Sequence, residues 1–416
     1  VSCAVFLVLR KLLPKRFDII YVSFETKLCG LLMKASKETY KKQNSFVEIR
    51  HNRSLQDIVP RLKKLRETLS ETSLSLVKKN LLQSALDEIL GNTKMRGRDL
   101  PFTLHAFNIA EIEKLTEKEL PRYLLYRYRY ETFPERYQLD DFPPCIQIEP
   151  TSICNYRCSF CYQIDEEFTK KSNGMMGMMT IELFKRVIDQ SVGRCEAITL
   201  ASRGEPLICP EIEAMLRYAG GKFLALKLNT NAWFLNERLC YAILESGVNT
   251  VVFSADAASE PSYSHLRVNG ELQRVYNNIK QFKDIRERHF SEVPILTRVS
   301  GVKVSGADEL EDMESFWGEL VDQVAFVKYS PWENTYEQPI NEIKKPCSDL
   351  WRRMFIWWNG DVNPCDIDFK SHLSIGSTVS GIVSELWQSQ KYTVLRENHR
   401  SQKRLHCEPC NRCTLI

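Results

Sequence analysis

Three cysteines within eight residues are the strongest chemical feature of this sequence. Cys154, Cys158 and Cys161 lie in the segment CNYRCSFC, with three and then two residues between them. Thiolates at such spacings let one loop cover one face of an iron–sulfur cluster. A zinc site more often shows two CxxC pairs or added histidine ligands, and no histidine lies near this triad. Because no fourth ligand is nearby, either a distant residue completes the site or one metal position stays open.

The triad directly follows the first of several short strands that we expect from residue 145 onward. Apolar, β-branched runs alternate there with helical patterns, which predicts a parallel sheet, open or curled into a partial barrel. The loop after a strand lies at the carboxyl end of such a sheet, where ligands gather. The expected strands are CIQIEP (145–150), AITLAS (197–202), ALKLNT (225–230), TVVFSA (250–255) and ILTRVS (295–300).

The length of the chain predicts more than one unit. A chain of 416 residues is long for a single core, so we expect two or three. The consecutive prolines of DDFPPC (140–145) mark a boundary. We therefore expect a mostly helical amino-terminal region of unknown role at 1–140, an α/β core at 141–335 and a cysteine-rich domain at 336–416.

The amino-terminal region begins with the apolar run VSCAVFLVL. Nine residues are too few to span a bilayer, and the run lacks the basic start of a secretory signal. We expect a short buried strand at 17–24 and a helix at 28–42. The chain does not begin with Met, which leaves open whether this end is complete.

Charge and cysteine usage narrow the class of protein. The net charge of +4 is small for this length, so nucleic-acid binding is not indicated. Eight of the 14 cysteines fall into two groups, a pattern unlike that of a small secreted disulfide scaffold. We therefore expect a cytoplasmic protein whose clustered thiols bind metal. The scattered cysteines are Cys3, Cys29, Cys145, Cys195, Cys209 and Cys240.

The pattern CxxxCxxC, with the aromatic Phe160 before the last cysteine, resembles the motif of the radical S-adenosylmethionine (radical SAM) superfamily. This resemblance implies a partial (β/α)6 barrel of the TIM type. It also implies that the triad holds a 4Fe–4S cluster whose open iron chelates the amino and carboxylate groups of SAM. Reductive cleavage of SAM would then form a 5′-deoxyadenosyl radical that abstracts a hydrogen atom from the substrate.

Four later segments, each at a strand, resemble further parts of that family's cofactor site. GEP resembles the segment that binds the methionine amino group, and KLNTNA (227–232) resembles a TNG-like turn with Ala232 in place of glycine. FSADAASEPSYSHLR resembles the ribose-contacting segment, and it also contains Tyr263 and Arg267. LTRVSG offers Arg298 as a candidate contact to the methionine carboxylate. Taken alone, each segment has an ordinary interpretation, such as a loop acid or a helix cap. The cofactor-contact residues implied are Phe160, Gly204, Glu205, Pro206, Asn229, Ser254, Asp256 and Arg298.

A second cysteine group lies near the carboxyl terminus. It resembles the SPASM or shorter twitch extension of radical SAM enzymes, a hairpin and helix that hold auxiliary clusters. Gly360 in the NGD segment is expected at the hairpin turn. The resemblance implies one auxiliary 4Fe–4S cluster, and a structural zinc knuckle is the alternative. We expect as ligands Cys347 and Cys365 together with two of Cys407, Cys410 and Cys413, of which Cys407 and Cys410 better match the family's CxxC.

The predicted function is that of a radical SAM enzyme acting as an oxidoreductase, an epimerase or a peptide-modifying enzyme. The substrate is expected to be small and polar, sugar-like, or a peptide, and the electron donor a flavodoxin or ferredoxin. Cys209 is a weak candidate for a hydrogen-atom donor, against the alternative of a buried structural thiol. Two other hypotheses remain: a non-catalytic iron–sulfur or zinc scaffold, and an RNA-modifying radical enzyme, which would more naturally carry a basic patch.

Overall fold

The structure is a computed structural model that describes residues 38–43, 46–49, 54–92, 100–304 and 310–415. From Glu38 onward the chain forms one compact unit. The strand expected at 17–24 lies outside the described residues. The helix expected at 28–42 is wrong at its carboxyl end, because Glu38–Gln43 is a strand that pairs with a neighbouring strand of the main sheet. Pairing with the sheet edge outweighs the weak helical preference of this charged segment.

An eleven-stranded sheet runs through the described part of the chain, in the order β11-β10-β9-β3-β4-β5-β6-β7-β8-β1-β2. Its strands are β1 (Glu38–Gln43), β2 (Phe46–Ile49), β3 (Cys145–Ile148), β4 (Ala197–Leu200), β5 (Ala225–Thr230), β6 (Thr250–Ser254), β7 (Leu296–Lys303), β8 (Gln323–Lys328), β9 (Arg353–Ile356), β10 (Asp361–Asn363) and β11 (Gly376–Ser377).

The six strands β3 to β8 form the α/β core. They follow one another in the sheet in chain order, and every neighbouring pair is parallel. The outer strands β3 and β8 pair with β9 and β1 instead of with each other, so the sheet stays open. This arrangement confirms the expected partial barrel, and five of its strands lie where the sequence predicted them.

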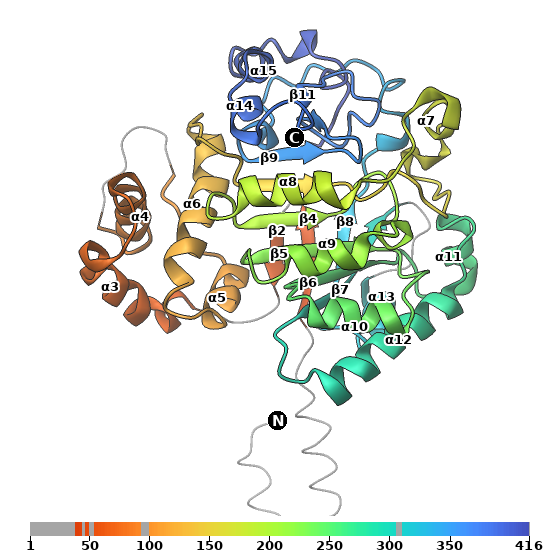
Figure 1. Cartoon of the computed structure of the whole chain (residues 1–416), viewed down its shortest axis with the longest axis horizontal. Helices are drawn as coiled ribbons and strands as arrows, with labels where there is room; N and C mark the ends of the chain where they lie inside the picture. The colour runs from red at the N-terminus through yellow and green to blue at the C-terminus, as the bar shows by residue number, and fades with distance from the viewer. Residues whose placement is uncertain (1–37, 44–45, 50–53, 93–99, 305–309, 416) are drawn as a thin grey trace, which may run out of the picture. The chain divides into compact units, whose positions relative to one another are not determined.

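Helices cover one face of this sheet. Figure 1 shows α8, α9, α10 and α12 in front of strands β4 to β7. Along β5 the alternation explains the packing: Leu226 and Leu228 are fully buried in the main core, whereas Lys227 and Asn229 lie on the other face. Parallel strands need such crossover helices. The helix α8 (Ile181–Ser191) is capped by Thr180, whose hydroxyl accepts a bond from the Leu183 N–H.

The helices of the described residues are α3 (Val59–Glu67), α4 (Leu76–Ile89), α5 (Ala106–Glu113), α6 (Leu120–Glu135), α7 (Glu166–Thr169), α8 (Ile181–Ser191), α9 (Ile212–Ala219), α10 (Glu237–Glu245), α11 (Glu260–Leu266), α12 (Leu272–His289), α13 (Leu310–Trp317), α14 (Val383–Trp387) and α15 (Gln390–Arg400). Helices α3 to α6 enclose a separate apolar cluster. No helix in the described ranges has the length and apolar character needed to cross a membrane.

The carboxyl-terminal region extends the sheet through a hairpin. Strand β9 pairs in parallel with β3, and β10 returns antiparallel to β9. Gly360 lies at the hairpin turn with a φ of +89°, as the NGD segment predicted, and a side chain there would be strained. This pairing holds the second cysteine group beside the first strand of the core. The domain limits at 140 and 335 remain predictions.

Candidate iron–sulfur and cofactor site

The loop after β3 brings the three motif cysteines together. The Cys161 N–H donates to the Cys158 carbonyl at 3.0 Å, which closes a tight turn between them. Burial raises the pKa of the Cys161 thiol to about 12, and the nearby Cys158 raises it further. Burial also raises the pKa of the Cys154 thiol, and Glu205 and the other two thiols raise this pKa further. The three cysteines therefore belong to one small apolar cluster.

Gly204 lets the GEP segment pack directly against the backbone of the cysteine loop. A Cβ at this position would lie 2.3 Å from the Thr151 carbonyl oxygen and 2.6 Å from that of Ile153. The next residue, Glu205, donates its N–H to the same Ile153 oxygen at 2.9 Å. Only glycine permits this approach, which explains the residue type in physical terms.

Glu205 connects the GEP segment to the turn after β5. Its carboxylate accepts a bond from the Thr230 hydroxyl at 2.6 Å and another from the Asn231 N–H at 2.7 Å. Asn231 in turn donates to the Asn155 side chain at 3.0 Å, and its amide lies 4.0 Å from the Cys154 sulfur. Burial raises the pKa of Glu205. Three strand ends are thus joined around the cysteine loop.

Ala232 occupies the glycine position of the TNG-like turn. It is fully buried and has a φ of +60°, a left-handed conformation that glycine adopts more readily. Its N–H donates to the Thr230 hydroxyl at 2.9 Å, which fixes the turn. The turn keeps the expected shape although the expected residue is replaced.

A buried charge pair lies beside the Cys158 sulfur. Asp256 has no exposed surface; it pairs with Arg267 and also accepts a bond from the Val302 N–H at 2.6 Å. A second nitrogen of Arg267 donates to the Cys158 sulfur at 3.6 Å. The guanidinium also lies 5.5 Å from the centre of the Phe160 ring. Both carboxylate oxygens of Asp256 are therefore engaged, and Arg267 is placed to act on the cysteine ligand.

The remaining cofactor candidates lie on the strands around this loop. Ser254 is half-buried at the end of β6, and Arg298 on β7 donates two bonds to the Gln323 side chain, at 2.9 and 2.7 Å. Asn229 lies on β5, and Pro206 begins a short helical turn. Their contacts with SAM remain predictions, as does that of Phe160, whose carbonyl accepts a bond from the Trp332 indole.

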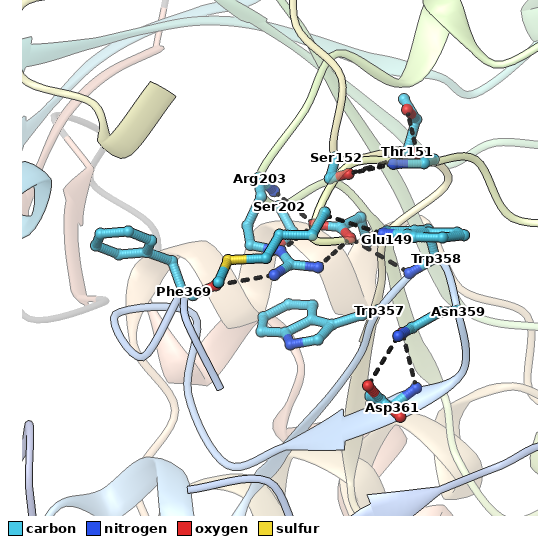
Figure 2. Close-up of polar contacts among 12 residues, drawn as sticks. Glu149, Thr151, Ser152, Ser202, Arg203, Trp357, Trp358, Asn359, Asp361 and Phe369 are labelled. Atoms are coloured by element: carbon cyan, nitrogen blue, oxygen red, sulfur yellow. Dashed lines mark hydrogen bonds and ion pairs between the residues drawn. The ribbon is translucent and has the colours of Figure 1, made fainter. Parts of the chain in front are cut away.

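A second buried ion pair connects the core to the carboxyl-terminal domain. Figure 2 shows the Arg203 guanidinium between Glu149 and the Phe369 carbonyl, above the Trp357 ring. Two of its nitrogens donate to Glu149 at 2.7 Å each, and its centre lies 4.1 Å from the indole. Arg203 immediately precedes the GEP segment, so this pair, which sequence reasoning missed, fixes that segment against the second cysteine domain.

Four of the five carboxyl-terminal cysteines line one cavity. They are Cys347, Cys365, Cys410 and Cys413. Cys407 does not line it; this thiol is 5% exposed and packs into the main apolar core. Sequence reasoning favoured Cys407 and Cys410, whereas the geometry favours Cys410 and Cys413. A CxxC spacing occurs at both pairs, so only the path of the chain separates them.

The lining of this cavity suits an anionic cluster. Arg404 is 1% exposed and donates to neutral oxygens, among them the Cys413 carbonyl at 2.6 Å, and its side chain also interacts with the Cys413 thiol. His399 accepts the Cys347 N–H at its Nδ1 atom, so Nε2 carries the proton. Both His399 Nε2 and Arg404 Nε are buried without a partner. A cluster held by four thiolates would supply the negative charge and sulfur acceptors that these donors lack.

The donor set does not match a single bound ion. Among the described residues, no group of three or more His, Cys, Asp or Glu side chains is placed to hold one metal ion. A four-iron cluster spreads its thiolates over a wider space than one ion does, so the two cysteine groups fit clusters in donor chemistry.

A larger cavity of about 820 Å³ lies between the sheet, the amino-terminal helices and the carboxyl-terminal domain. Its wall includes Lys227 from β5 on one side and Cys347, Cys365 and Cys413 on the other. Tyr329 and Trp332 also line it, and both pack in the apolar cluster around the motif cysteines. Sequence reasoning missed this cavity, although a lysine within the apolar strand ALKLNT was a usable signal.

Cys209 lies away from that cavity. It is 1% exposed, packs in the main core and points its sulfur toward the Met179 carbonyl at 3.9 Å. Burial raises the pKa of its thiol. This environment favours the buried structural thiol over the hydrogen-atom donor.

Two family models match the chain. Residues 148–313 match the model of the radical SAM superfamily, and residues 347–414 match the SPASM iron–sulfur cluster-binding domain. The first range contains the motif cysteines and the GEP segment, and the second contains all five carboxyl-terminal cysteines.

Known proteins resemble this chain at low identity. An uncharacterized protein of Methanocaldococcus jannaschii is 27% identical over 134 residues, which span 32% of this chain and 41% of that protein, less than half its length. The S-adenosyl-L-methionine-dependent 2-deoxy-scyllo-inosamine dehydrogenase of Niallia circulans is 21% identical over 281 residues, 66% of this chain and 94% of that enzyme. The crystal structure of Streptococcus suis SuiB bound to precursor peptide SuiA gives a TM-score of 0.51 at 15% identity, covering 90% of this chain and 89% of that one, which supports the fold.

Proposed function

Because the chain belongs to the radical SAM superfamily and carries a SPASM-type domain, we propose that it abstracts a hydrogen atom from a small polar substrate in the cavity between Lys227 and Cys365. Members of this superfamily are enzymes that bind a 4Fe–4S cluster and SAM, and the SPASM domain binds auxiliary iron–sulfur clusters. The net reaction, the substrate and its binding cavity are our proposals.

The position of the cavity is the observation that carries this proposal. Its volume of about 820 Å³ lies within the usual range for sites that enclose a small molecule. Barrel-interior strand residues form one wall and three cysteines of the second group form another. A substrate held there would lie beside the second cysteine group, and Tyr329 and Trp332 connect the same cavity to the residues packed around the motif cysteines. The Niallia circulans relative, named a dehydrogenase of an inosamine, also favours a small polar substrate.

The residues around the motif cysteines prepare the first step. Cys154, Cys158 and Cys161 would hold the catalytic cluster and leave one iron for SAM. When bound, the cluster supplies one electron that breaks a carbon–sulfur bond of SAM, and the resulting carbon radical takes a hydrogen atom from the substrate. Glu205 keeps the loops in register, and Tyr329 and Trp332 pack beside the loop and also line the larger cavity, where their apolar surface limits water.

The auxiliary cluster is proposed to be held by Cys347, Cys365, Cys410 and Cys413. The shared cavity and the buried charge of Arg404 support this set. A cluster held by these cysteines would supply an electron acceptor beside the larger cavity, because Cys347, Cys365 and Cys413 line both spaces.

The first experiment tests turnover. Anaerobic protein loaded with iron and sulfide is reduced in the presence of SAM, and 5′-deoxyadenosine is measured. We expect deoxyadenosine from the wild type and none from a Cys154/Cys158/Cys161→Ala triple variant. A fully loaded wild-type protein that forms no deoxyadenosine would instead be a scaffold without turnover.

The second experiment tests the auxiliary ligands with a matched pair. Cys413→Ser should lose about four irons, the content of one cluster, whereas Cys407→Ser should keep them. Iron and sulfide analysis of both variants decides whether Cys413 or Cys407 is a ligand of the auxiliary cluster. Loss of iron in Cys407→Ser, with retention in Cys413→Ser, would restore the pair that sequence spacing favoured.

A further inference from the structure

Two cations from distant parts of the chain share one wall of the large cavity. Lys227 lies on β5 between two fully buried leucines, so its side chain lies on the cavity face of the sheet. Arg353 begins β9 in the carboxyl-terminal domain and lines the same cavity. The two are close enough that Arg353 lowers the pKa of Lys227.

Lys227 has no partner for its charge among the described residues. Its side chain makes no hydrogen bond or ion pair with them. Its pKa is lowered to about 8, first because enclosure by protein disfavours the ammonium and then because Arg353 repels it. Only the Cys145 thiol acts in the opposite direction, and burial keeps that thiol neutral by raising its pKa. An unmatched cation in such surroundings costs folding free energy, which a bound anion would offset.

Arg353 is only loosely paired. Its Nε donates to the Tyr130 hydroxyl at 2.9 Å, its ion-pair partner Asp349 lies 3.8 Å away, and it also attracts the carboxyl of Asp366 without a hydrogen bond between them. Asp349 is engaged more closely by Arg352, at 2.8 Å. The guanidinium therefore lacks the two short, parallel bonds to a carboxylate that it forms best.

We infer that the substrate binds through a carboxylate or phosphate group that pairs with Lys227 and Arg353, an inference that rests on the proposed function. A shared anion replaces the repulsion between the two cations by two attractions in a partly desolvated space. Phosphate and carboxylate share this chemistry, and the experiment below separates them.

Acceptor groups near the two cations describe the rest of the substrate. Asn229 lines the cavity, and its side-chain oxygen is buried without a donor. Asp366 also lines the cavity and receives a single bond from Gln147, at 3.2 Å. Hydroxyl or amino groups would satisfy these acceptors. The substrate class is therefore a small carboxylate or phosphate that carries hydroxyl or amino groups.

The location separates this anion site from the cofactor site. Lys227 lies three residues before Thr230, which is about 10 Å along the strand. Thr230 contacts Glu205 at the end of this strand. None of Cys154, Cys158 and Cys161 lines the cavity, whereas Cys347 and Cys365 do. The carboxylate of SAM is thus expected elsewhere.

Lysine footprinting tests the inference without turnover. The cluster-loaded protein is treated anaerobically with acetic anhydride near pH 8, and acylation of Lys227 is quantified by mass spectrometry. Chloride is replaced by inorganic phosphate or by acetate at constant ionic strength. At a concentration about three times its Kd, a bound anion should slow acylation about fourfold. The exposed Lys280 on α12 serves as the internal reference.

Two variants sharpen the assignment. Arg353→Met should reduce the protection of Lys227, and Arg353→Lys should keep part of it. Lys345→Met removes an exposed cation at the same cavity and should leave the protection unchanged, because solvent screens that charge. Should Arg353→Met fail to fold, the comparison of phosphate, acetate and chloride in the wild type still decides the result.

Each outcome has one meaning. Protection by phosphate, acetate or both supports the site and identifies its anion. Equal acylation in all three salts overturns the inference, and so does protection by SAM alone, which would assign Lys227 to the cofactor. A wild type that shows anion protection but forms no deoxyadenosine would refute the proposed function while leaving the anion site intact.

Discussion

The charge pair beside Cys158 leads to a quantitative prediction about the catalytic cluster. The perturbation is the double variant Asp256→Asn/Arg267→Met, which removes both charges and the contact of Arg267 with the Cys158 sulfur. Asparagine keeps an oxygen that can accept the Val302 N–H bond. Removing Arg267 alone would instead leave a fully buried carboxylate unpaired and destabilise the fold by about 3–5 kcal/mol.

The magnitude follows from the contact itself. A hydrogen bond to a charged group contributes about 1.5–3 kcal/mol, and the 3.6 Å distance between Arg267 nitrogen and Cys158 sulfur favours the lower value. Reduction adds one negative charge that is spread over the cluster. We take about half of the hydrogen-bond energy as the part that favours the reduced cluster over the oxidised one. Without the bond, the reduced cluster is then less stable by about 0.75 kcal/mol, which equals about 30 mV of potential for one electron. The double variant should therefore have a potential lower by about 30 mV.

The single variant Asp256→Asn is the matched control with the opposite sign. It leaves the Arg267 cation beside Cys158 without its counter-charge. Asp256 acts electrostatically on the Cys158 thiol, so removing its negative charge should raise the potential.

The assay is a redox titration followed by EPR, in which the signal that changes on addition of SAM identifies the catalytic cluster. The expected order of potentials is Asp256→Asn highest, wild type next and the double variant lowest. A double variant whose potential equals or exceeds that of the wild type would refute the role assigned to Arg267.

Three further predictions concern the packing of the site. Gly204→Ala should lower the melting temperature and weaken SAM binding measured by calorimetry, because its Cβ would meet the Thr151 carbonyl at 2.3 Å; unchanged binding would contradict the tight packing. Arg203→Met should lower the free energy of unfolding in urea by about 3–5 kcal/mol, and adding Glu149→Gln should recover part of it; no recovery would show that the ion pair is not the cause. Lys227→Met should be more stable than the wild type by about 1–3 kcal/mol at pH 7. The pKa of about 8 in the folded state is lower than the ordinary 10.5, so the unfolded chain binds more protons between these values and wild-type stability rises there with pH. The difference in unfolding free energy between Lys227→Met and the wild type should therefore vanish by pH 10.5. A difference that stays constant with pH would contradict the lowered pKa of Lys227.

The features that the sequence determined by itself are local. The spacing of Cys154, Cys158 and Cys161 sets three thiols on one loop wherever that loop is placed. Apolar, β-branched runs alternating with helical patterns likewise predicted β3 to β7 and helices between them, because these preferences act within a few residues. Local reasoning failed at Glu38–Gln43, where pairing with a distant strand decided the conformation.

The tertiary structure alone decided how distant residues meet. Cys407, Cys410 and Cys413 are equivalent by spacing, and only the folded path turns one of them into the apolar core. The approach of Lys227 to Arg353, from β5 and β9, depends on the way the carboxyl-terminal hairpin extends the sheet beside β3. The pKa and burial of Lys227 are properties of the folded cavity, because they depend on every segment that encloses it.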